Sequence, residues 1–248
     1  MLDPSYDSAL VVASFLISAL GAYSALTAMS LHRSQGRVSR FNVFLAALAL
    51  GGVGIWSMHF LGMLAWHVEL AVGYRLVETV VSLVAAVLAS ALALGYMAAG
   101  PFTFSRLAVA GTLTGVGVAA MHYLGMHSMR FGGYFDWNLV IVAGSVLIAV
   151  VAATAALWLA FHVQGRAHRV AASFVMAGAV CTMHYTGMAA ASVVCTTSTP
   201  KAWLPGLLRP ADLPMLVIVV ALGVAAFIAM DLLIQRTART GGQAKLAA

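Results

Sequence analysis

The sequence predicts an all-α membrane protein with seven transmembrane helices. Hydrophobic residues make up 62% of the 248 positions and charged residues only 8%, whereas an average soluble domain is about 25% charged. Seven apolar runs are long enough to cross a bilayer, which takes about 20 residues per helix. The runs are continuous rather than alternating, so they are typical of helices and not of the strands of a membrane barrel. We therefore expect the lipid bilayer to be the main surrounding of this chain.

The expected helices follow one another along nearly the whole chain. Their joints contain charged residues or helix-stopping glycine and proline, and the longest joint, 195–213, holds three prolines. We place the helices at 8–31, 41–66, 76–99, 107–127, 139–161, 170–194 and 214–233.

Lysine and arginine are distributed unevenly over the joints. With the N-terminus outside, nine of the 13 basic residues lie in inner segments and four in outer ones. Because inner loops of membrane proteins are enriched in these residues, we expect an outside N-terminus and a cytoplasmic C-terminus. The same bias explains the net charge of +6, so no nucleic-acid partner is expected.

One short motif occurs three times, in the second, fourth and sixth expected helices. Each copy reads Met-His-aromatic-x-Gly-Met, and the histidines are His59, His122 and His184. Their spacings of 63 and 62 positions indicate three parallel helix-pair repeats followed by one further helix. All three motifs fall in the outer half of their helices, at similar depths.

Each motif brings nitrogen and sulfur ligands together. In a helix, a histidine shares a face with the methionine four positions later, while the preceding methionine and the motif glycine are offset from it by about 100° and 60°. A polar group in lipid needs a partner, and packing alone does not require histidine and methionine together three times. We therefore expect one shared metal site formed by His59, His122, His184, Met63, Met126, Met188, Met58, Met121 and Met183.

Imidazole and thioether ligands favour copper, Cu(I) above all, over magnesium, calcium or manganese. Zinc is less favoured, because zinc sites in proteins use cysteine, histidine and carboxylates and rarely methionine. Haem with a histidine or methionine axial ligand is an alternative, and it would be bound non-covalently because no Cys-x-x-Cys-His sequence is present.

Three further residues lie close to the motifs in sequence. His67 and His127 either extend the site toward the outer surface or are ordinary residues at helix ends, and Cys181 either approaches His184 or packs in the core. Glu78, near the outer end of the third expected helix, is a candidate to orient an imidazole as a neighbouring carboxylate.

The motif resembles the signature of the MHYT domain family. Residues 183–186 read Met-His-Tyr-Thr, residues 121–124 read Met-His-Tyr-Leu, and residues 58–61 depart with Met-His-Phe-Leu. The resemblance implies a sensor in the bacterial cytoplasmic (inner) membrane. It also implies copper bound by these Met and His residues near the outer face, and sensing of oxygen, carbon monoxide or nitric oxide.

Many members of that family carry cyclase or phosphodiesterase domains. Here residues 1–236 form the expected sensor domain, and the tail 237–248 is too short for a catalytic domain. We therefore expect a stand-alone module that signals through a separate partner and is not an enzyme. The alternatives are a copper or other metal-ion transport or storage protein, and a haem-binding redox protein.

Overall fold

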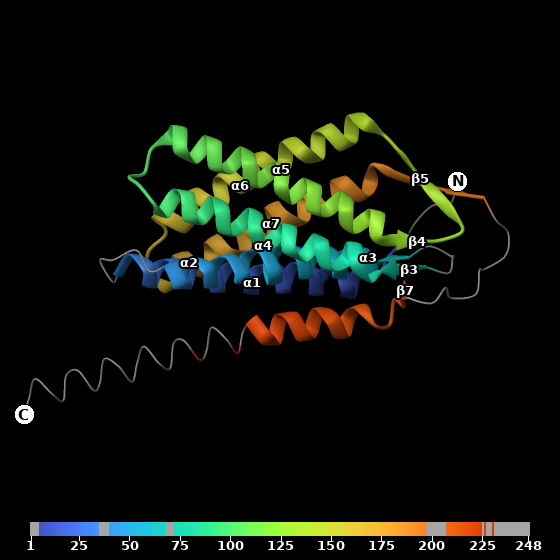
Figure 1. Cartoon of the computed structure of the whole chain (residues 1–248), viewed down its shortest axis with the longest axis horizontal. Coiled ribbons are helices and arrows are strands. Elements are labelled where there is room, and N and C mark those ends of the chain that lie inside the picture. Colours follow the sequence, from blue (N-terminus) through green and yellow to red (C-terminus); the bar gives the residue numbers. More distant parts are fainter. Residues whose placement is uncertain are drawn as a thin grey trace, which may run out of the picture.

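The computed structural model describes residues 5–34, 40–67, 72–196 and 207–224, with 226 and 230, and the expected tail lies outside these ranges. The described chain is mostly helical (Figure 1). A further apolar helical segment, Leu213–Val224, follows the named helices. The helices are α1 (Ser8–Ser34), α2 (Arg40–Ala47), the π-helix η1 (Leu48–Ser57), α3 (Met58–Ala65), α4 (Leu76–Ala98), α5 (Phe104–Ser128), α6 (Leu139–His162) and α7 (Arg166–Ala189).

Among the described residues, five helices are long and apolar enough to span a membrane, fewer than the seven expected. The helix α7 is equally long, but it is less apolar, because it contains two arginines in its first turn and polar residues such as His184 and Thr186 near its end. The segment Leu213–Val224 is shorter than a span. The five candidate spans are Ser8–Ser30, Arg40–Ala65, Leu76–Ala98, Phe104–Ser128 and Leu139–His162.

The helices form a closed ring around one core. Going round the ring, α1 packs on η1, then come α4, α5, α6 and α7, and α7 packs again on α1. The three motif helices, α3, α5 and α7, therefore alternate with α1, α4 and α6 and also contact one another in the middle. Glycine permits the close approach: a Cβ on Gly51 would overlap the backbone of α4, and one on Gly115 the backbone of α6.

Burial differs between the two kinds of helix. In the run Arg40–Ala65, 89% of the most apolar stretch is buried inside the protein, against 11% for Leu139–His162. The first motif helix is thus almost fully covered by its neighbours, whereas α6 presents most of its surface to the surroundings. Within the first motif helix, the η1 segment is wound as a π-helix, and the Ser57 hydroxyl donates to the carbonyl of Gly52, five positions earlier, at 3.0 Å.

Short antiparallel strands lie together at one end of the bundle, which we call the strand end. Strand β1 pairs with β2, β3 lies between β4 and β7, and β5 pairs with β6 from Gly133–Cys195 to Trp137–Ala191. The strands are β1 (Ser5–Tyr6), β2 (Trp66–His67), β3 (Gly73–Arg75), β4 (Met129–Arg130), β5 (Gly133–Trp137), β6 (Ala191–Cys195) and β7 (Leu207–Leu208).

The strands correct the expectation of helices and plain joints. The sixth helix was expected at 170–194, but α7 begins at Arg166 and ends at Ala189, and β6 follows. Tyr134, Phe135 and Trp137 in β5, and Val193 and Val194 in β6, are residue types that favour strand pairing. The pairing also satisfies backbone groups that would otherwise lie beside the apolar helix ends.

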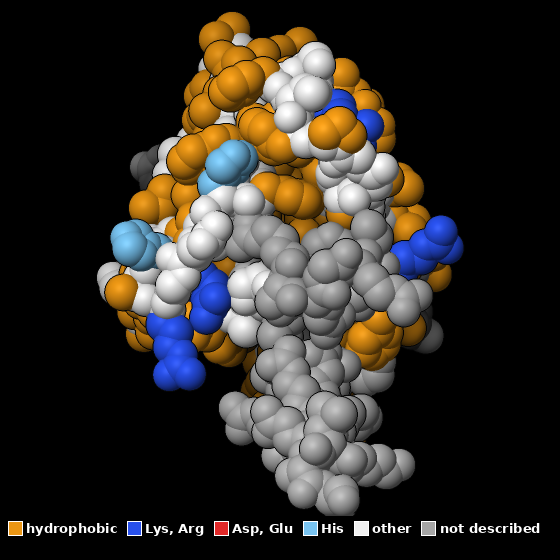
Figure 2. Space-filling view, turned by 90° about the vertical axis from the view of Figure 1, so that its left-hand side faces the viewer, with side chains coloured by type: hydrophobic (Ala, Val, Ile, Leu, Met, Phe, Trp, Pro, Cys, Tyr) orange, Lys and Arg blue, Asp and Glu red, His pale blue; other side chains and the backbone are white. Residues whose placement is uncertain are grey.

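The two ends of the bundle differ in charge. Within the described ranges, the acidic residues Asp7, Glu78, Asp136 and Asp212 all belong to the strand end. Figure 2 views the opposite end, where arginine and histidine side chains are visible among the described residues and no acidic one is. The acidic residues thus lie at the end that the distribution of lysine and arginine predicts to be the outer one.

Candidate metal centre

The three motif histidines occupy equivalent places in the fold. His59, His122 and His184 lie in α3, α5 and α7, five or six residues before each helix ends at the strands. All three side chains are at most 1% exposed. Because the three helices meet inside the ring at equal depth, their histidines face one another.

The imidazoles form a compact triad. The Nδ1 atom of His59 lies 3.1 Å from Nδ1 of His184 and 3.1 Å from Nδ1 of His122, and the remaining pair is 3.3 Å apart. The rings stand nearly perpendicular to one another, with centroids 4.9–5.1 Å apart. Each histidine thus directs the same nitrogen toward one common point.

The glycine of each motif receives the imidazole of the next helix. A Cβ on Gly62 would collide with Nε2 of His184, one on Gly125 with Nε2 of His59, and one on Gly187 with Nε2 of His122. The contacts run in a cycle from α7 to α3, from α3 to α5 and from α5 back to α7. The motif glycine is therefore required because a neighbouring helix places a ring where a side chain would be.

The geometry of the triad fits a metal ion. A neutral imidazole has one N–H and one acceptor nitrogen, so three lone pairs can face the common point. For the observed Nδ1 separations, that point lies about 1.8 Å from each atom, close to the 2.0–2.1 Å typical of zinc–nitrogen bonds. Within the described residues, these three histidines also form the one group of three or more His, Cys, Asp or Glu able to share an ion.

The residue after each histidine is aromatic and packs against the imidazole. Phe60, Tyr123 and Tyr185 each lie edge-on to the preceding imidazole, with ring centroids 4.8–4.9 Å apart. The Tyr123 hydroxyl is 2.6 Å from Ser145 Oγ on α6, and the Tyr185 hydroxyl is 3.0 Å from Ser14 Oγ on α1. Both tyrosines thus link a motif helix to its outer neighbour.

In the first repeat a tryptophan makes the equivalent link. Phe60 has no hydroxyl, but Trp56 Nε1 donates to Ser82 Oγ on α4 at 3.0 Å. Each of the three serines donates its own proton to the carbonyl three positions earlier, so each accepts from the aromatic residue. The substitution of phenylalanine for tyrosine in this copy is therefore compensated one turn away.

Removing one of these hydroxyl groups is expected to weaken the fold. Tyr123→Phe leaves Ser145 without its donor and should lower the free energy of unfolding by about 1 kcal/mol. Chemical unfolding in detergent measures the change, with Tyr134→Phe, at a tyrosine 56% exposed, as the control. Equal effects of the two substitutions would show that the link to α6 is not stabilising.

The three repeats match a known protein family. The MHYT model, described as "Bacterial signalling protein N terminal repeat", matches residues 52–110, 115–173 and 178–242. The chain belongs to the MHYT family. In this division each MHYT repeat begins at a motif and includes the helix after it, so α1 precedes the repeats, whereas the sequence had suggested that the odd helix comes last.

MHYT relatives are larger signalling proteins. The bifunctional diguanylate cyclase/cyclic di-GMP phosphodiesterase MucR of Pseudomonas aeruginosa is 40% identical over 77% of this chain and 29% of its own length. The cyclic di-GMP phosphodiesterase NbdA of the same species is 36% identical over 84% and 28%, respectively. The signaling protein YkoW of Bacillus subtilis is 29% identical over 76% and 24%. The chain thus spans less than a third of each of these relatives, and no solved structure matches it significantly.

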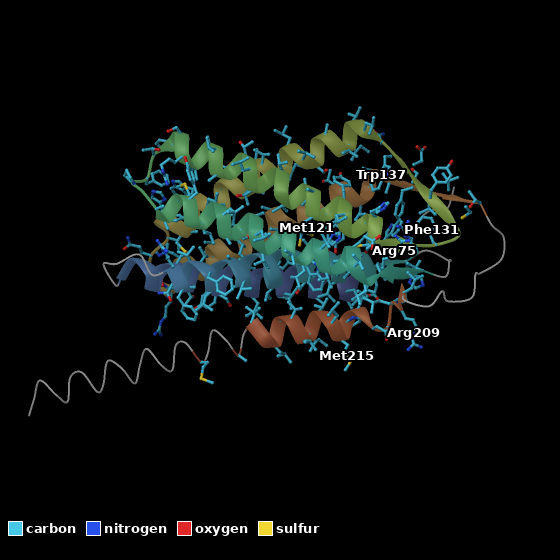
Figure 3. The ribbon with its side chains drawn as sticks, viewed as in Figure 1. Arg75, Met121, Phe131, Trp137, Arg209 and Met215 are labelled. Atoms are coloured by element: carbon cyan, nitrogen blue, oxygen red, sulfur yellow. The ribbon has the colours of Figure 1, made fainter. Side chains whose placement is uncertain are left out.

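The methionines of the MHYT motifs are in the core around the triad. All six are at most 2% exposed. Met121 lies well inside the bundle, away from Phe131 and Trp137 at the strand end (Figure 3). Met183 lines a cavity described below. The structure thus buries every predicted methionine.

The other predicted residues lie apart from the triad. His67 is exposed in β2, opposite Ser5, and His127 is exposed at the end of α5. Cys181 faces the groove between α1 and α7 that Phe15 also lines. None of the three belongs to the group of residues able to share an ion.

Glu78 does not orient an imidazole. It pairs instead with Arg75 at 2.9 Å and with Arg130 at 3.5 Å. Strand β3 ends and α4 begins at this point, so the two guanidinium groups reach the carboxylate first. Glu78 therefore ties β3 and β4 to α4.

An aromatic layer, absent from the predicted site, covers the triad on the strand side. Trp137 packs on Tyr123 and on Phe135, which in turn contacts Trp66. The strand β3 adds Tyr74, which is 2% exposed, and burial raises the pKa of its phenol above the usual range. The pairing of β5 with β6 could not be read from helical periodicity, so this cover was missed.

Proposed function

We propose that this chain is a membrane signalling sensor that binds a copper ion through His59, His122 and His184. The convergence of the three Nδ1 atoms carries the proposal. Copper is favoured because imidazoles beside buried thioethers form a soft ligand set. The motif methionines, all buried in the surrounding turns, are the proposed additional ligands, and they favour Cu(I).

The proposed signal is a diatomic gas: oxygen, carbon monoxide or nitric oxide. Reduced copper supplies affinity for such molecules. The protein residues hold the imidazoles in place and exclude water with the aromatic layer. Each histidine also touches the glycine of a neighbouring motif helix, so a small movement of one ring is passed to the next helix. Such tightly packed interfaces convert small shifts into helix movements.

We further propose that the strand end faces the outside of the bacterial cytoplasmic membrane. The distribution of the described charges supports this orientation, because inner segments are enriched in arginine and lysine. The helix movement would then be read on the cytoplasmic side. The relatives named for cyclic di-GMP synthesis and breakdown point to enzymes of that class as the signalling partner.

Metal analysis of the purified chain tests the proposal. We expect about one copper ion per chain in detergent, and a visible or EPR signal that changes when carbon monoxide or nitric oxide is added. The His67→Ala variant is the control, because this exposed residue lies outside the triad. A chain that takes up no copper would contradict the proposal. A Soret band would instead identify haem, and copper flux into liposomes would identify a transporter.

A further inference from the structure

A small apolar cavity lies inside the helix ring, next to the triad. Its volume is about 40 Å³. Three of its residues, Ile55, Val118 and Val180, each precede a triad histidine by four positions, so the cavity lies one helical turn from the imidazoles, away from the strands. The full lining is Leu50, Ile55, Ser90, Ala93, Leu94, Thr114, Val118, Ala149, Ala152, Ala153, Ala156, Leu157, Met176, Val180 and Met183.

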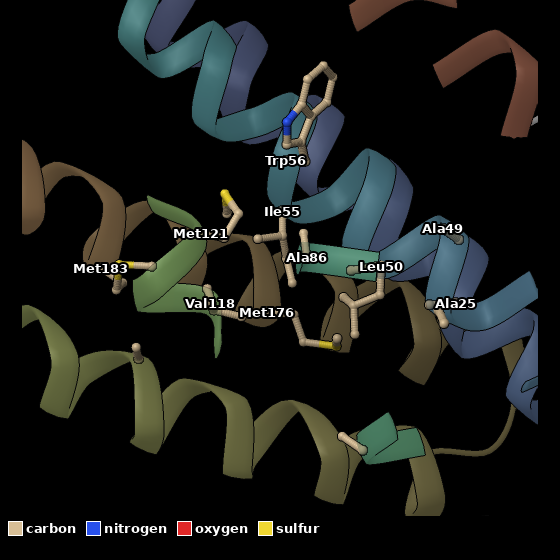
Figure 4. Packing of buried hydrophobic residues seen from close by; sticks show 14 of the residues in the cluster. Ala25, Ala49, Leu50, Ile55, Trp56, Ala86, Val118, Met121, Met176 and Met183 are labelled. Carbon is tan, nitrogen blue, oxygen red and sulfur yellow. The ribbon is translucent and has the colours of Figure 1, made fainter. Parts of the chain in front are cut away.

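Buried hydrophobic side chains pack around this cavity. Figure 4 shows Ile55, Val118, Met176 and Met183 around the same region of the bundle, beside Leu50. These side chains come from η1, α5 and α7, the same runs that supply the triad. A molecule in the cavity would therefore touch all three motif helices.

The cavity contains a polar group without a partner. Ser90 is 1% exposed, and its hydroxyl has no hydrogen-bond partner among the described residues. Other buried serines, such as Ser82 and Ser145, donate to the carbonyl three positions earlier. A hydroxyl buried without an acceptor is unfavourable by about 1–3 kcal/mol. Ser90 can therefore donate a hydrogen bond to an occupant of the cavity that is weakly polar at one end.

The lining determines the chemistry of that occupant. Only Ser90 and Thr114 are polar among the lining residues, and the Thr114 hydroxyl already donates to the carbonyl of Ala110 at 2.6 Å. An ordered water makes about three hydrogen bonds, which this wall does not supply. A molecule of two or three heavy atoms that is apolar, or weakly polar at one end, suits the site better.

The wall of the cavity on the α6 side consists mainly of small residues. The helix α6 is the least buried candidate span, and it contributes alanines to the wall. Three of them, Ala152, Ala153 and Ala156, are partly exposed on the surface of the ring. Alanine leaves the wall thin at this point, where the surroundings are lipid and concentrate apolar molecules.

We infer that this cavity is a binding site for a small apolar molecule that enters from the bilayer past the alanines of α6. The signalling role of this cavity, as a site that binds the signal molecule next to the triad, rests on the proposed function. Its occupancy, however, depends on cavity shape and needs no metal. The two ideas can therefore be tested separately.

Xenon is a suitable probe, because it occupies small apolar cavities. The full chain, free of metal and in lipid nanodiscs, would be placed under xenon pressure while methionine methyl shifts are recorded by NMR. We expect saturable shifts at Met176 and Met183, which line the cavity, and no saturable shift at Met215, which is 71% exposed. The absence of saturable shifts at the lining methionines would overturn the inference.

Two matched variants of α6 locate the site. Ala153→Leu fills the cavity and should weaken xenon binding about ten-fold or more, whereas Ala155→Leu, on the exposed face of the same helix, should leave it unchanged. Equal xenon affinity in the two variants would overturn the inference. Ser90→Ala is a second, smaller change that should retain xenon binding, because the wall becomes more apolar, and loss of binding in this folded variant would also contradict the inference.

Copper binding by the same chain, measured in separate samples to which copper is added, separates the two proposals. If copper binds and xenon does not, the cavity site is wrong and the metal centre stands. If xenon binds and copper does not, the metal centre is wrong and the cavity stands.

Discussion

Replacing Gly187 with alanine is expected to destabilise the folded chain by about 3 kcal/mol, because the new methyl group collides with His122. The imidazole is surrounded by buried side chains and cannot move aside without breaking its contacts with His59 and His184. The variant should therefore also lose most of its copper binding. Thermal unfolding in detergent and metal analysis of the folded fraction measure the two effects.

The same helix offers a matched control. Gly178 also lies in α7, but a Cβ there would meet nothing within 4 Å. Alanine has the higher helix propensity, so Gly178→Ala should stabilise the chain by about 0.5–1 kcal/mol. Opposite signs for the two substitutions would establish the contact. If Gly187→Ala were as stable as Gly178→Ala, the cyclic packing of imidazole on glycine would be refuted.

Loss of a single triad histidine is expected to weaken copper binding about 100-fold or more, since one of three nitrogen ligands disappears. The effect should be similar for His59→Ala, His122→Ala and His184→Ala, because the three positions are nearly equivalent in distance and burial. Competition with a chelator of known affinity measures the change.

Stability provides an independent measurement of the same ligands. Copper at about 1,000 times its dissociation constant should stabilise the wild-type chain by about 4 kcal/mol, and a 100-fold loss of affinity in His122→Ala should reduce this gain to about 1.4 kcal/mol or less. His127→Ala, five positions further along α5 and exposed, should retain it. If His122→Ala kept the wild-type response, the metal would have to lie elsewhere.

Much of the fold could be predicted from the sequence because lipid imposes a simple rule. Each apolar run had to become a helix, and the described helices match the expected runs closely. Three copies of one motif at one depth also predicted that His59, His122 and His184 would occupy equivalent positions in their helices. What periodicity could not provide was the rotation of each helix about its axis, on which the meeting of the three rings depends.

Details that depend on contacts between distant segments were beyond the sequence. The motif glycine was placed within about 60° of its own histidine, but nothing in the sequence shows that it contacts the histidine of a different helix. Glu78 was expected beside an imidazole, yet two arginines lie closer. The pairing of β5 with β6 joins segments almost 60 positions apart, and such pairing leaves little trace in a helical pattern.

The three repeats carry a further consequence because they belong to one polypeptide. Symmetric proteins generally obtain repeated contacts by assembling identical subunits, and such a centre falls apart when the protein is diluted. Here one chain provides all three imidazoles, so formation of the centre does not depend on how many copies a cell contains. Each copy is also free to diverge, as the exchange of a tyrosine hydroxyl for the Trp56 indole already shows. A protein present at low concentration can thus form a site from three repeats, and each repeat can change in sequence independently of the other two.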